Sequence, residues 1–233
     1  MINSSGSITK MGLLLYTTEF SKPLPADSFR RMLGQLPDFL QPKILRYRRW
    51  QDAHADLFGK HLLRLALEKV GFSTALDNLH YTPQEKPYFR QGPHFNISHS
   101  GNRVVCLLST QTRVGIDIEA ITPIPFGNFQ TQFTTKEWTA IQNAPYPIAT
   151  FYRFWTAKES LIKADGRGLH IPLLDLDVTE DGTILLDGAT WTFRPLDLFP
   201  GYACYIATEG SAGRDLEFHP MTPEEILTAN LNV

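Results

Sequence analysis

Strict alternation of apolar and acidic residues in Gly115-Ile116-Asp117-Ile118-Glu119 leaves little choice but a β-strand. Because side chains along a strand point alternately to its two faces, Ile116 and Ile118 are expected in the core. Asp117 and Glu119 then project from the opposite face, about 6.6 Å apart along the strand. Carboxylates this close repel each other, and a divalent cation that prefers oxygen ligands, Mg²⁺ in particular, would relieve the repulsion. The solvated polar face of a half-exposed strand explains the same pattern.

Helical patterns and short apolar runs divide most of the remaining chain. In the first half we expect a strand at Met11–Thr17 and helices at Asp27–Leu36 and Lys43–Val70. A second strand at Phe95–Ser98 follows, and then a central hairpin that pairs Arg103–Ser109 with Arg113–Glu119. In the second half we expect helices at Thr134–Asn143 and Ile148–Asp165. An antiparallel meander of four strands follows, at Leu173–Thr179, Thr183–Leu186, Thr190–Phe193 and Tyr202–Thr208. The predicted fold class is therefore α+β.

Net charge and cysteine content limit the functions open to the chain. Its 233 residues include 22 Lys and Arg against 24 Asp and Glu, so the net charge of −2 gives no general attraction for nucleic acid or anionic membranes. Cys106 and Cys204 lie in apolar runs, which is typical of small buried thiols in a reducing compartment. The apolar stretch from Leu13 to Tyr16 is too short for a signal peptide or a membrane span. We therefore expect a cytoplasmic monomer.

A second group of charged residues lies in the helical segment Trp155-Thr-Ala-Lys-Glu-Ser-Leu-Ile-Lys163. Trp155, Glu159 and Lys163 are spaced four residues apart and share one face of the expected helix. An exposed ion pair beside a packed tryptophan has the same spacing. The helix is apolar over much of its circumference, however, so Glu159 and Lys163 are expected to border a groove that can hold a substrate.

The segment Asn96-Ile-Ser-His-Ser-Gly101 places two hydroxyls and an imidazole beside a turn. Such a cluster suits the oxygen atoms of a phosphate, which favours Ser98 and His99 as ligand contacts. A serine and a histidine could also belong to a hydrolase triad, but the chain lacks the Gly-x-Ser-x-Gly turn that presents such a serine. A purely structural histidine is the third possibility.

Four motifs in fixed order distinguish these possibilities: Asn96-Ile-Ser-His-Ser100, Gly115-Ile-Asp-Ile-Glu119, Trp155-Thr-Ala-Lys-Glu-Ser-Leu-Ile-Lys163 and Gly166-Arg-Gly-Leu169. Together they resemble the 4′-phosphopantetheinyl transferases of the surfactin-synthetase type. Each motif alone is weak, but the combination is specific, and the similarity covers roughly residues 40–210.

The resemblance implies two similar α+β subdomains related by a pseudo-twofold axis, which we place at residues 1–110 and 111–233. It also implies that coenzyme A and Mg²⁺ bind at their junction and that the substrate is a serine of an acyl or peptidyl carrier protein. The product released would be 3′,5′-ADP. By similarity, the metal ligands would be Asp117, Glu119 and Glu159, and the catalytic groups would be Glu159, Lys163 and His99.

The same resemblance suggests the coenzyme A contacts, namely Lys43, Arg46, Lys86, Ser98, His99, Lys158 and Lys163. Of these, Lys43 and Arg46 would meet the 3′-phosphate. The chain departs from the family pattern twice: Glu85 stands before Lys86 where a glycine is usual, and Ala55 stands where many members have an arginine. Lys60 is a candidate replacement for that missing charge, although a lysine on a helix is ordinarily just solvated.

Glu137 has two interpretations. The segment Phe133–Trp138 resembles a family segment whose glutamate lies near the active centre. Thr134 and Glu137 also have the spacing of a capping box, in which the glutamate accepts a hydrogen bond from the backbone amide at the start of the helix.

Two further functions compete with the transferase. A carrier-binding module without activity would keep the fold and lose a carboxylate, whereas Asp117, Glu119 and Glu159 are all present. A metal-dependent phosphodiesterase or nuclease would use the basic run Lys43–Arg49, but the net charge disfavours it. The sequence does not identify the carrier, because partner choice depends on surface complementarity.

Overall fold

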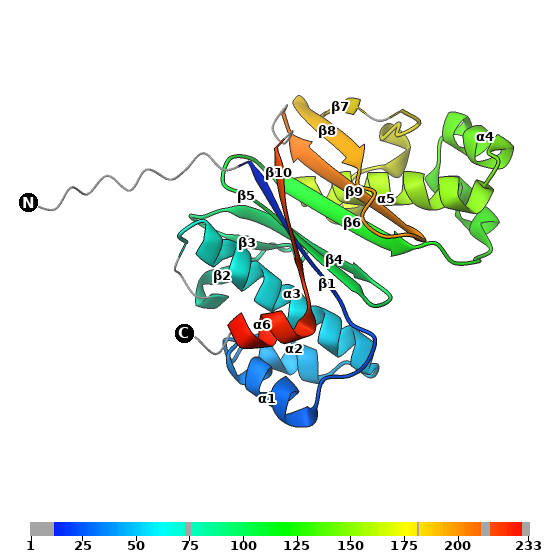
Figure 1. Cartoon of the computed structure of the whole chain (residues 1–233). Coiled ribbons are helices and arrows are strands. Elements are labelled where there is room, and N and C mark those ends of the chain that lie inside the picture. Colours follow the sequence, from blue (N-terminus) through cyan, green and yellow to red (C-terminus); the bar gives the residue numbers. More distant parts are fainter. Residues whose placement is uncertain (1–11, 73–75, 181, 211–214, 230–233) are drawn as a thin grey trace, which may run out of the picture.

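The computed structural model describes residues 12–72, 76–180, 182–210 and 215–229, and for Leu169 the backbone alone. The fold is a mixed α+β architecture in which two four-stranded sheets each carry one long helix (Figure 1). No helix in these ranges is both long and apolar enough to cross a lipid bilayer.

The N-terminal half is built on a sheet with strand order β10-β1-β5-β4. Its strands are β10 (Leu216–Met221), β1 (Leu13–Glu19), β5 (Arg103–Ser109) and β4 (His94–Ser100). Three helices accompany it, α1 (Ala26–Gly34), α2 (Gln41–Leu45) and α3 (Trp50–Lys69). A short hairpin of β2 (Leu79–Tyr81) and β3 (Pro87–Phe89) follows a 3₁₀ turn at Leu76–Asn78.

The C-terminal half has a sheet with strand order β6-β9-β8-β7. Its strands are β6 (Val114–Ala120), β9 (Tyr202–Glu209), β8 (Ala189–Pro195) and β7 (Gly182–Leu186). Helices α4 (Thr135–Asn143) and α5 (Pro147–Asp165) lie between β6 and β7 in the chain, with 3₁₀ turns at Phe126–Gln132, Gly168–His170 and Leu173–Asp175. The last helix is α6 (Pro223–Ala229).

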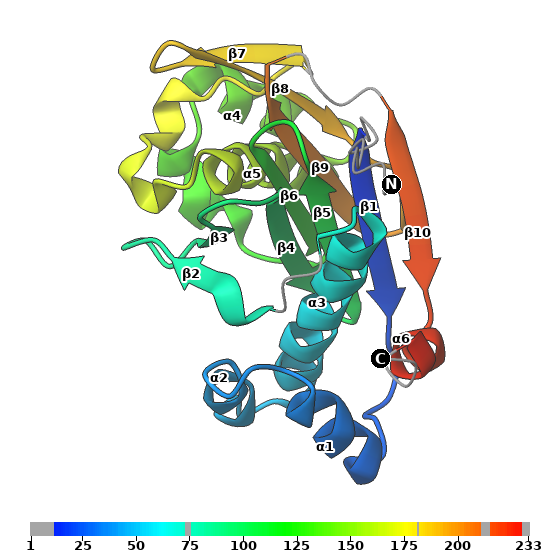
Figure 2. The same cartoon turned by 90° about the vertical axis from the view of Figure 1, so that its left-hand side faces the viewer.

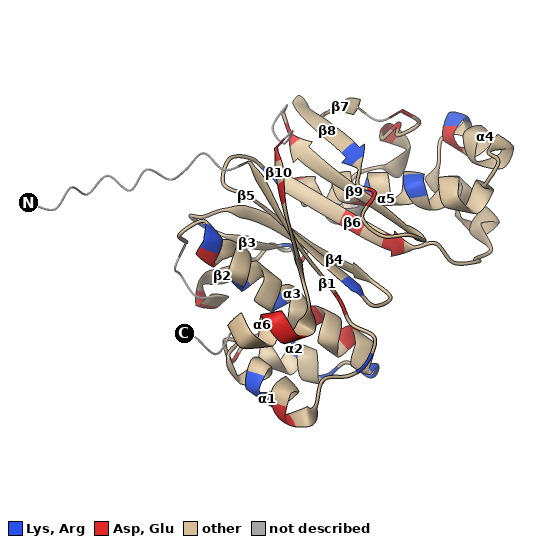
Figure 3. Ribbon diagram, viewed as in Figure 1, with Lys and Arg blue, Asp and Glu red and all other residues tan. Residues whose placement is uncertain are grey.

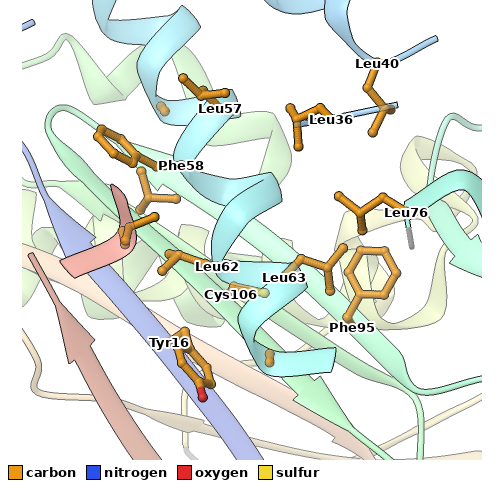
Figure 4. Packing of buried hydrophobic residues seen from close by; sticks show 14 of the residues in the cluster. Tyr16, Leu36, Leu40, Leu57, Phe58, Leu62, Leu63, Leu76, Phe95 and Cys106 are labelled. Carbon is orange, nitrogen blue, oxygen red and sulfur yellow. The ribbon is translucent and has the colours of Figure 1, made fainter. Parts of the chain in front are cut away.

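Three apolar cores join these elements into four layers, helix on sheet on sheet on helix (Figures 1 and 2). Phe58 and Leu62 of α3 pack against Cys106 of β5 in the first core (Figure 4). A second core lies between the two sheets, where Val105 meets Ile116. The third joins α5 to the C-terminal sheet. The junction of the two halves is therefore a packed sheet-on-sheet interface, and the expectation that Ile116 and Ile118 face the core is confirmed.

Four sequence-based expectations need correction. The helix expected over Lys43–Val70 is divided, because α2 ends at Leu45 and α3 begins only at Trp50. Arg103–Ser109 and Arg113–Glu119 do not form a hairpin, because β5 pairs with β1 and β4 while β6 pairs with β9 of the other sheet. Leu173–Thr179 is not a strand but a 3₁₀ turn followed by irregular chain. The strand expected at Met11–Thr17 is found as β1, with Met11 outside the described residues.

The last correction concerns the division of the chain. After β9 the chain returns to the N-terminal half, where β10 pairs in parallel with β1 and α6 packs against α3 (Figure 1). Residues 216–229 therefore lie with the N-terminal half, although the division at residue 110 placed them in the other half. The strand β10 was not expected from the sequence.

Helix α5 approaches β6 very closely at Gly115. A Cβ atom on Gly115 would lie 2.1 Å from the carbonyl oxygen of Ser160 and 2.4 Å from the amide nitrogen of Ala164. Real Cβ atoms do not come this near to backbone, so only glycine permits this packing. As a result, the face of β6 that carries Asp117 and Glu119 lies directly under α5.

Glu85, in the turn between β2 and β3, has a left-handed backbone with φ of 62°. A side chain in this region costs about 1–2 kcal/mol, whereas glycine adopts it freely. We expect Glu85→Gly to raise the free energy of unfolding by about 0.5–1 kcal/mol, after allowing for the larger entropy of glycine in the unfolded chain. Urea unfolding measures this. Gln84→Gly, in the same turn without a positive φ, should destabilise instead, and an equal effect of both variants would contradict the explanation.

Candidate active site

The acidic residues of β6 face α5, the helix that carries Glu159 and Lys163 (Figure 3). Asp117 is 2% exposed, and Glu119 and Glu159 are half-buried. Lys163 Nζ bonds to Asp117 Oδ1. The structure thus brings the predicted lysine to a predicted carboxylate 46 residues away in the chain, and places Glu159 on the same helix as that lysine.

Side chains of β4 join the two sheets next to these carboxylates. Asn96 Oδ1 accepts a hydrogen bond from the backbone N–H of Ile116 (2.9 Å), and Ser100 Oγ accepts one from the N–H of Ala120 (3.0 Å). Ser98 and Ser100 also donate to Asp117 Oδ1 (2.9 Å) and Glu119 Oε2 (2.8 Å). Alternate residues of one strand therefore take the place of a backbone ladder and orient both carboxylates.

Asp117 has one carboxylate oxygen in use and one without a partner. Oδ1 accepts hydrogen bonds from both Ser98 and Lys163. Oδ2 is buried and, within the described part of the chain, has no hydrogen-bond partner. A buried carboxylate oxygen without a donor is unfavourable unless a ligand supplies one or a cation binds there.

The raised pKa values of Glu119 and Glu159 also favour a bound cation. The pKa of Glu119 is raised by desolvation and then by the charge of Asp117, against the opposing effects of Ser100 and Lys163. The pKa of Glu159 is also raised by desolvation and by Asp117, and Lys163 only partly opposes the shift. Ionised together, these groups repel one another, and a divalent cation would remove the repulsion.

The residues present fit a hard divalent cation by chemistry, though not by their current spacing. All the candidate ligands are carboxylate oxygens, which Mg²⁺ prefers, and Asp117 Oδ2 is available. Among the residues that the structure describes, no three His, Cys, Asp or Glu side chains are near enough together to enclose a metal ion. The Glu119 and Glu159 side chains would have to turn toward Asp117 to complete such a site.

His99 lies on the other face of β4 from Ser98 and Ser100. Those two hydroxyls bond to the carboxylates of β6, so they form no triad with His99. The pKa of His99 is lowered by desolvation and by Lys163, while Asp56 on α3 opposes the shift. His99 therefore lies between the carboxylate cluster and the basic residues of the N-terminal half.

The turn of the β2–β3 hairpin closes one side of the site. Lys86 Nζ donates to the carbonyl oxygen of Ala164 near the end of α5 (2.7 Å), and desolvation followed by the charge of Arg113 lowers the pKa of Lys86 to about 8. A cleft of about 280 Å³ lies between this turn and α5, lined by Lys86, Asn96, Glu159 and Lys163 among others. A larger cavity of about 730 Å³ beside Phe72 and Phe89 shares no described lining residue with it.

Lys158 lies away from this cleft, although the sequence suggested a coenzyme A contact. It is 1% exposed, and its ammonium donates to Glu137 Oε2 (2.7 Å) and to the carbonyl oxygens of Leu173 (2.7 Å) and Gln132 (3.2 Å). Protein groups therefore enclose the ammonium inside the C-terminal half. We leave Lys158 out of the candidate site.

Glu137 forms the capping box that was one of its two interpretations. Its carboxylate accepts from the backbone N–H of Thr134 (2.8 Å), while the Thr134 side chain accepts from the N–H of Glu137 (3.1 Å). Its second oxygen accepts from the N–H of Val178 (3.1 Å). Glu137 is fully buried and acts with Lys158 as a structural centre of this half.

The basic residues of the N-terminal half surround a carboxylate. Lys43 and Arg46 are exposed at α2 and its end, as a phosphate contact requires. Lys60 is not solvated, contrary to the ordinary expectation for a helix surface, because it is nearly enclosed and its Nζ lies 2.6 Å from Asp56 Oδ1. Asp56 follows Ala55, the position where the arginine is missing.

Sequence reasoning missed four residues of this region: Asn96, Ser100, Gly115 and Asp56. The alternation of small polar residues at 96, 98 and 100 was visible in the sequence. It did not reveal that these side chains bond to a strand of another sheet, because that pairing is set by the packing of two separately formed sheets. Asp56 carried no signal, since an acidic residue on a helix is ordinary.

Comparisons with known proteins identify the family to which this chain is similar. The sequence profile of the 4′-phosphopantetheinyl transferase superfamily matches residues 113–206, which include β6 and α5. A 4′-phosphopantetheinyl transferase of Bacillus subtilis is 33% identical over 181 residues, 74% of this chain and 80% of its own length. The transferase gsp of Aneurinibacillus migulanus is 31% identical (80% and 81% covered), and Sfp of B. subtilis strain 168 is 28% identical (91% and 95% covered).

Proposed function

Because the chain belongs to the 4′-phosphopantetheinyl transferase superfamily, we propose that the cleft between α5 and the β2–β3 turn is where it carries out the reaction of that family. The chain is a 4′-phosphopantetheinyl transferase: it transfers the 4′-phosphopantetheine group of coenzyme A to a serine of a carrier protein. The bond formed joins the serine oxygen to phosphorus, and the phosphate bridge breaks to release 3′,5′-ADP.

One observation carries the placement of the reaction. Within the described residues, Asp117 Oδ2 is buried without a hydrogen-bond partner, close to Glu159 and Lys163, which line the cleft. A site built for a polyanionic substrate needs both fixed cations and a means of binding a further cation. Lys163 and Lys86 supply the first, and the carboxylates supply the second.

Mg²⁺ is the cation that we propose for this site, held by Asp117, Glu119 and Glu159. When bound, it would neutralise charge on the pyrophosphate of coenzyme A. The support comes from the all-oxygen donor set, the free Asp117 oxygen and the raised pKa values of the two glutamates, whose first cause is desolvation.

The remaining roles belong to side chains around the cleft. Glu159 would take the proton of the attacking serine, directly or through a water, because its carboxylate lines the cleft. Lys163 and His99 would stabilise charge on the phosphates, and Ser98 holds both Asp117 and Lys163 in place. Lys86 would add a cation from the opposite wall. Lys43 and Arg46 would meet the 3′-phosphate.

The direct test is intact-mass analysis of several apo carrier proteins, acyl and peptidyl, after incubation with this protein, coenzyme A and Mg²⁺. A mass increment of one phosphopantetheine on a carrier establishes both activity and partner. Carrier binding without an increment would favour a binding module instead. Release of 3′,5′-ADP from coenzyme A without a carrier would favour a phosphodiesterase.

Binding of the cation should be visible without turnover. We expect millimolar Mg²⁺ to raise the melting temperature of the protein, because a ligand that binds only the folded state stabilises it. Without Mg²⁺, Glu159→Gln should melt at the same temperature as wild type or higher. With Mg²⁺, it should lose most of the rise in melting temperature. The control is Glu224→Gln, which replaces an exposed carboxylate on α6 and should keep the full rise in melting temperature. An unchanged rise in Glu159→Gln would remove this residue from the ligand set.

The location and assembly of the protein are further proposals. Cys106 and Cys204 are both buried and free, and burial raises the pKa of Cys106 to about 12, so neither is poised for a disulfide. This supports a reducing cytoplasm as the site of action. We propose that the chain acts as a monomer on its carrier.

A further inference from the structure

A nearly buried carboxylate lies beside Lys43, one of the two cations proposed to bind the 3′-phosphate of coenzyme A. Asp56 Oδ1 accepts a hydrogen bond from Lys60 Nζ (2.6 Å). Asp56 Oδ2 lies 4.0 Å from Lys43 Nζ and accepts a longer bond from the Tyr47 hydroxyl (3.4 Å). The side chains of Asp56 and Lys60 are 9% and 11% exposed, whereas that of Lys43 is 59% exposed.

These contacts keep Asp56 ionised. Burial alone would raise the pKa of Asp56, but the charges of Lys60, Lys43 and His99 outweigh it and hold the pKa below its ordinary value. The positive charge of Lys60 is therefore already neutralised inside the protein. Lys60 therefore does not supply the charge of the arginine that many family members have at the position of Ala55.

A phosphate that approached Lys43 would also approach this fixed carboxylate. For scale, two unit charges 4 Å apart repel each other by about 1 kcal/mol at the dielectric constant of bulk water, a factor of about five in affinity, and the repulsion falls with distance. A charge-assisted contact to a phosphate is ordinarily worth about 10- to 150-fold. Because Asp56 pairs with Lys60, the two side chains together add no net charge for the 3′-phosphate, which leaves the exposed Lys43 and Arg46 to bind it.

We propose that Asp56 is a specificity-determining residue, whose carboxylate offsets the cations at this end of the site and lets the chain use coenzyme A and 3′-dephospho-coenzyme A with similar efficiency. The inference rests on the proposed function. The chemistry at the reacting phosphorus is the same for both donors: the serine oxygen displaces the bridging oxygen, and the leaving group is 5′-AMP in place of 3′,5′-ADP.

The experiment compares kcat/KM for the two donors with one carrier protein, in wild type and in a series of charge variants. Wild type should prefer coenzyme A by less than about tenfold. Asp56→Asn should raise this preference at least about fivefold, because it removes the repulsion and frees Lys60. Lys60→Met should lower it by a similar factor, and the double variant Asp56→Asn with Lys60→Met should return close to wild type.

The ratio of the two donors separates specificity from folding. A structural defect lowers transfer from both donors alike and leaves their ratio unchanged, whereas the proposal predicts that the ratio follows the local charge. A wild-type preference above about tenfold, or a ratio that neither Asp56→Asn nor Lys60→Met changes, would overturn the inference. If Asp56→Asn does not fold, Lys60→Met and the wild-type ratio decide the matter. The proposed function fails separately, when wild type modifies no carrier with either donor.

Discussion

Glu159→Gln is expected to lower kcat for carrier modification by at least about a hundredfold, because the variant loses both the proposed base and a ligand of the cation. The Glu159 carboxylate has no hydrogen-bond partner in the described part of the chain, and its charge is repelled by Asp117 and Glu119. The fold should therefore stay intact, with an unchanged or higher melting temperature. Turnover is followed by the mass of the modified carrier, with coenzyme A and the carrier protein both at saturating concentration.

Asp117→Asn gives an independent view of the same site. It keeps the shape of the side chain and one oxygen for Ser98, but it loses the charge that binds Lys163. Transfer should again fall strongly. If either variant retained near-native turnover at millimolar Mg²⁺, the residue concerned would not act as proposed, and the base would have to be sought among water or other groups.

Lys158→Met is expected to lower the free energy of unfolding by about 3–5 kcal/mol, the cost of leaving one member of a buried ion pair without its partner. Glu137 would then be a fully buried carboxyl group whose remaining donors are two backbone amides. Such a loss is a large share of the stability of a typical domain. Urea unfolding followed by far-UV circular dichroism measures it.

A double-mutant cycle shows whether the pair itself is responsible. Glu137→Gln together with Lys158→Met should cost less than the sum of the single variants, because the two residues contact each other directly. Lys136→Met is the matched control, since Lys136 pairs with Asp177 at 3.1 Å on the surface, where both side chains are about half exposed. Its cost should stay below about 1 kcal/mol. Equal costs for Lys136→Met and Lys158→Met would contradict a special role for the buried pair.

The parts of the fold that depend on local chemistry were predictable from the sequence. The capping box at Thr134, the glycine at the end of α5 and the Asp187-Gly188 turn are all found, and in that turn both residues have positive φ values, 48° and 80°. Each is fixed by residues within a few positions of one another. Periodicity likewise predicted which face of β6 carries its carboxylates.

What could not be predicted depends on how distant segments pack. Arg103–Ser109 and Arg113–Glu119 have the composition and spacing of a hairpin, but the turn between them links two different sheets. Local sequence does not distinguish these cases, because each strand finds better partners elsewhere in the chain. For the same reason the pattern that grouped Lys158 with the substrate contacts did not reveal its burial against Glu137.

The return of the chain to its first sheet affects how the protein can be made. Until residues 216–221 leave the ribosome, β1 has β5 on one side and nothing on the other, so its backbone donors and acceptors form an open edge. A ribosome adds about 5–20 residues per second, so this edge stays exposed for several seconds or longer while the C-terminal half is synthesised. Nascent chains that meet on a polysome in that interval can pair through β1. Removal of residues 216–229 would make the open edge permanent, and a shortened chain of this kind should aggregate on expression although every residue of the candidate site remains.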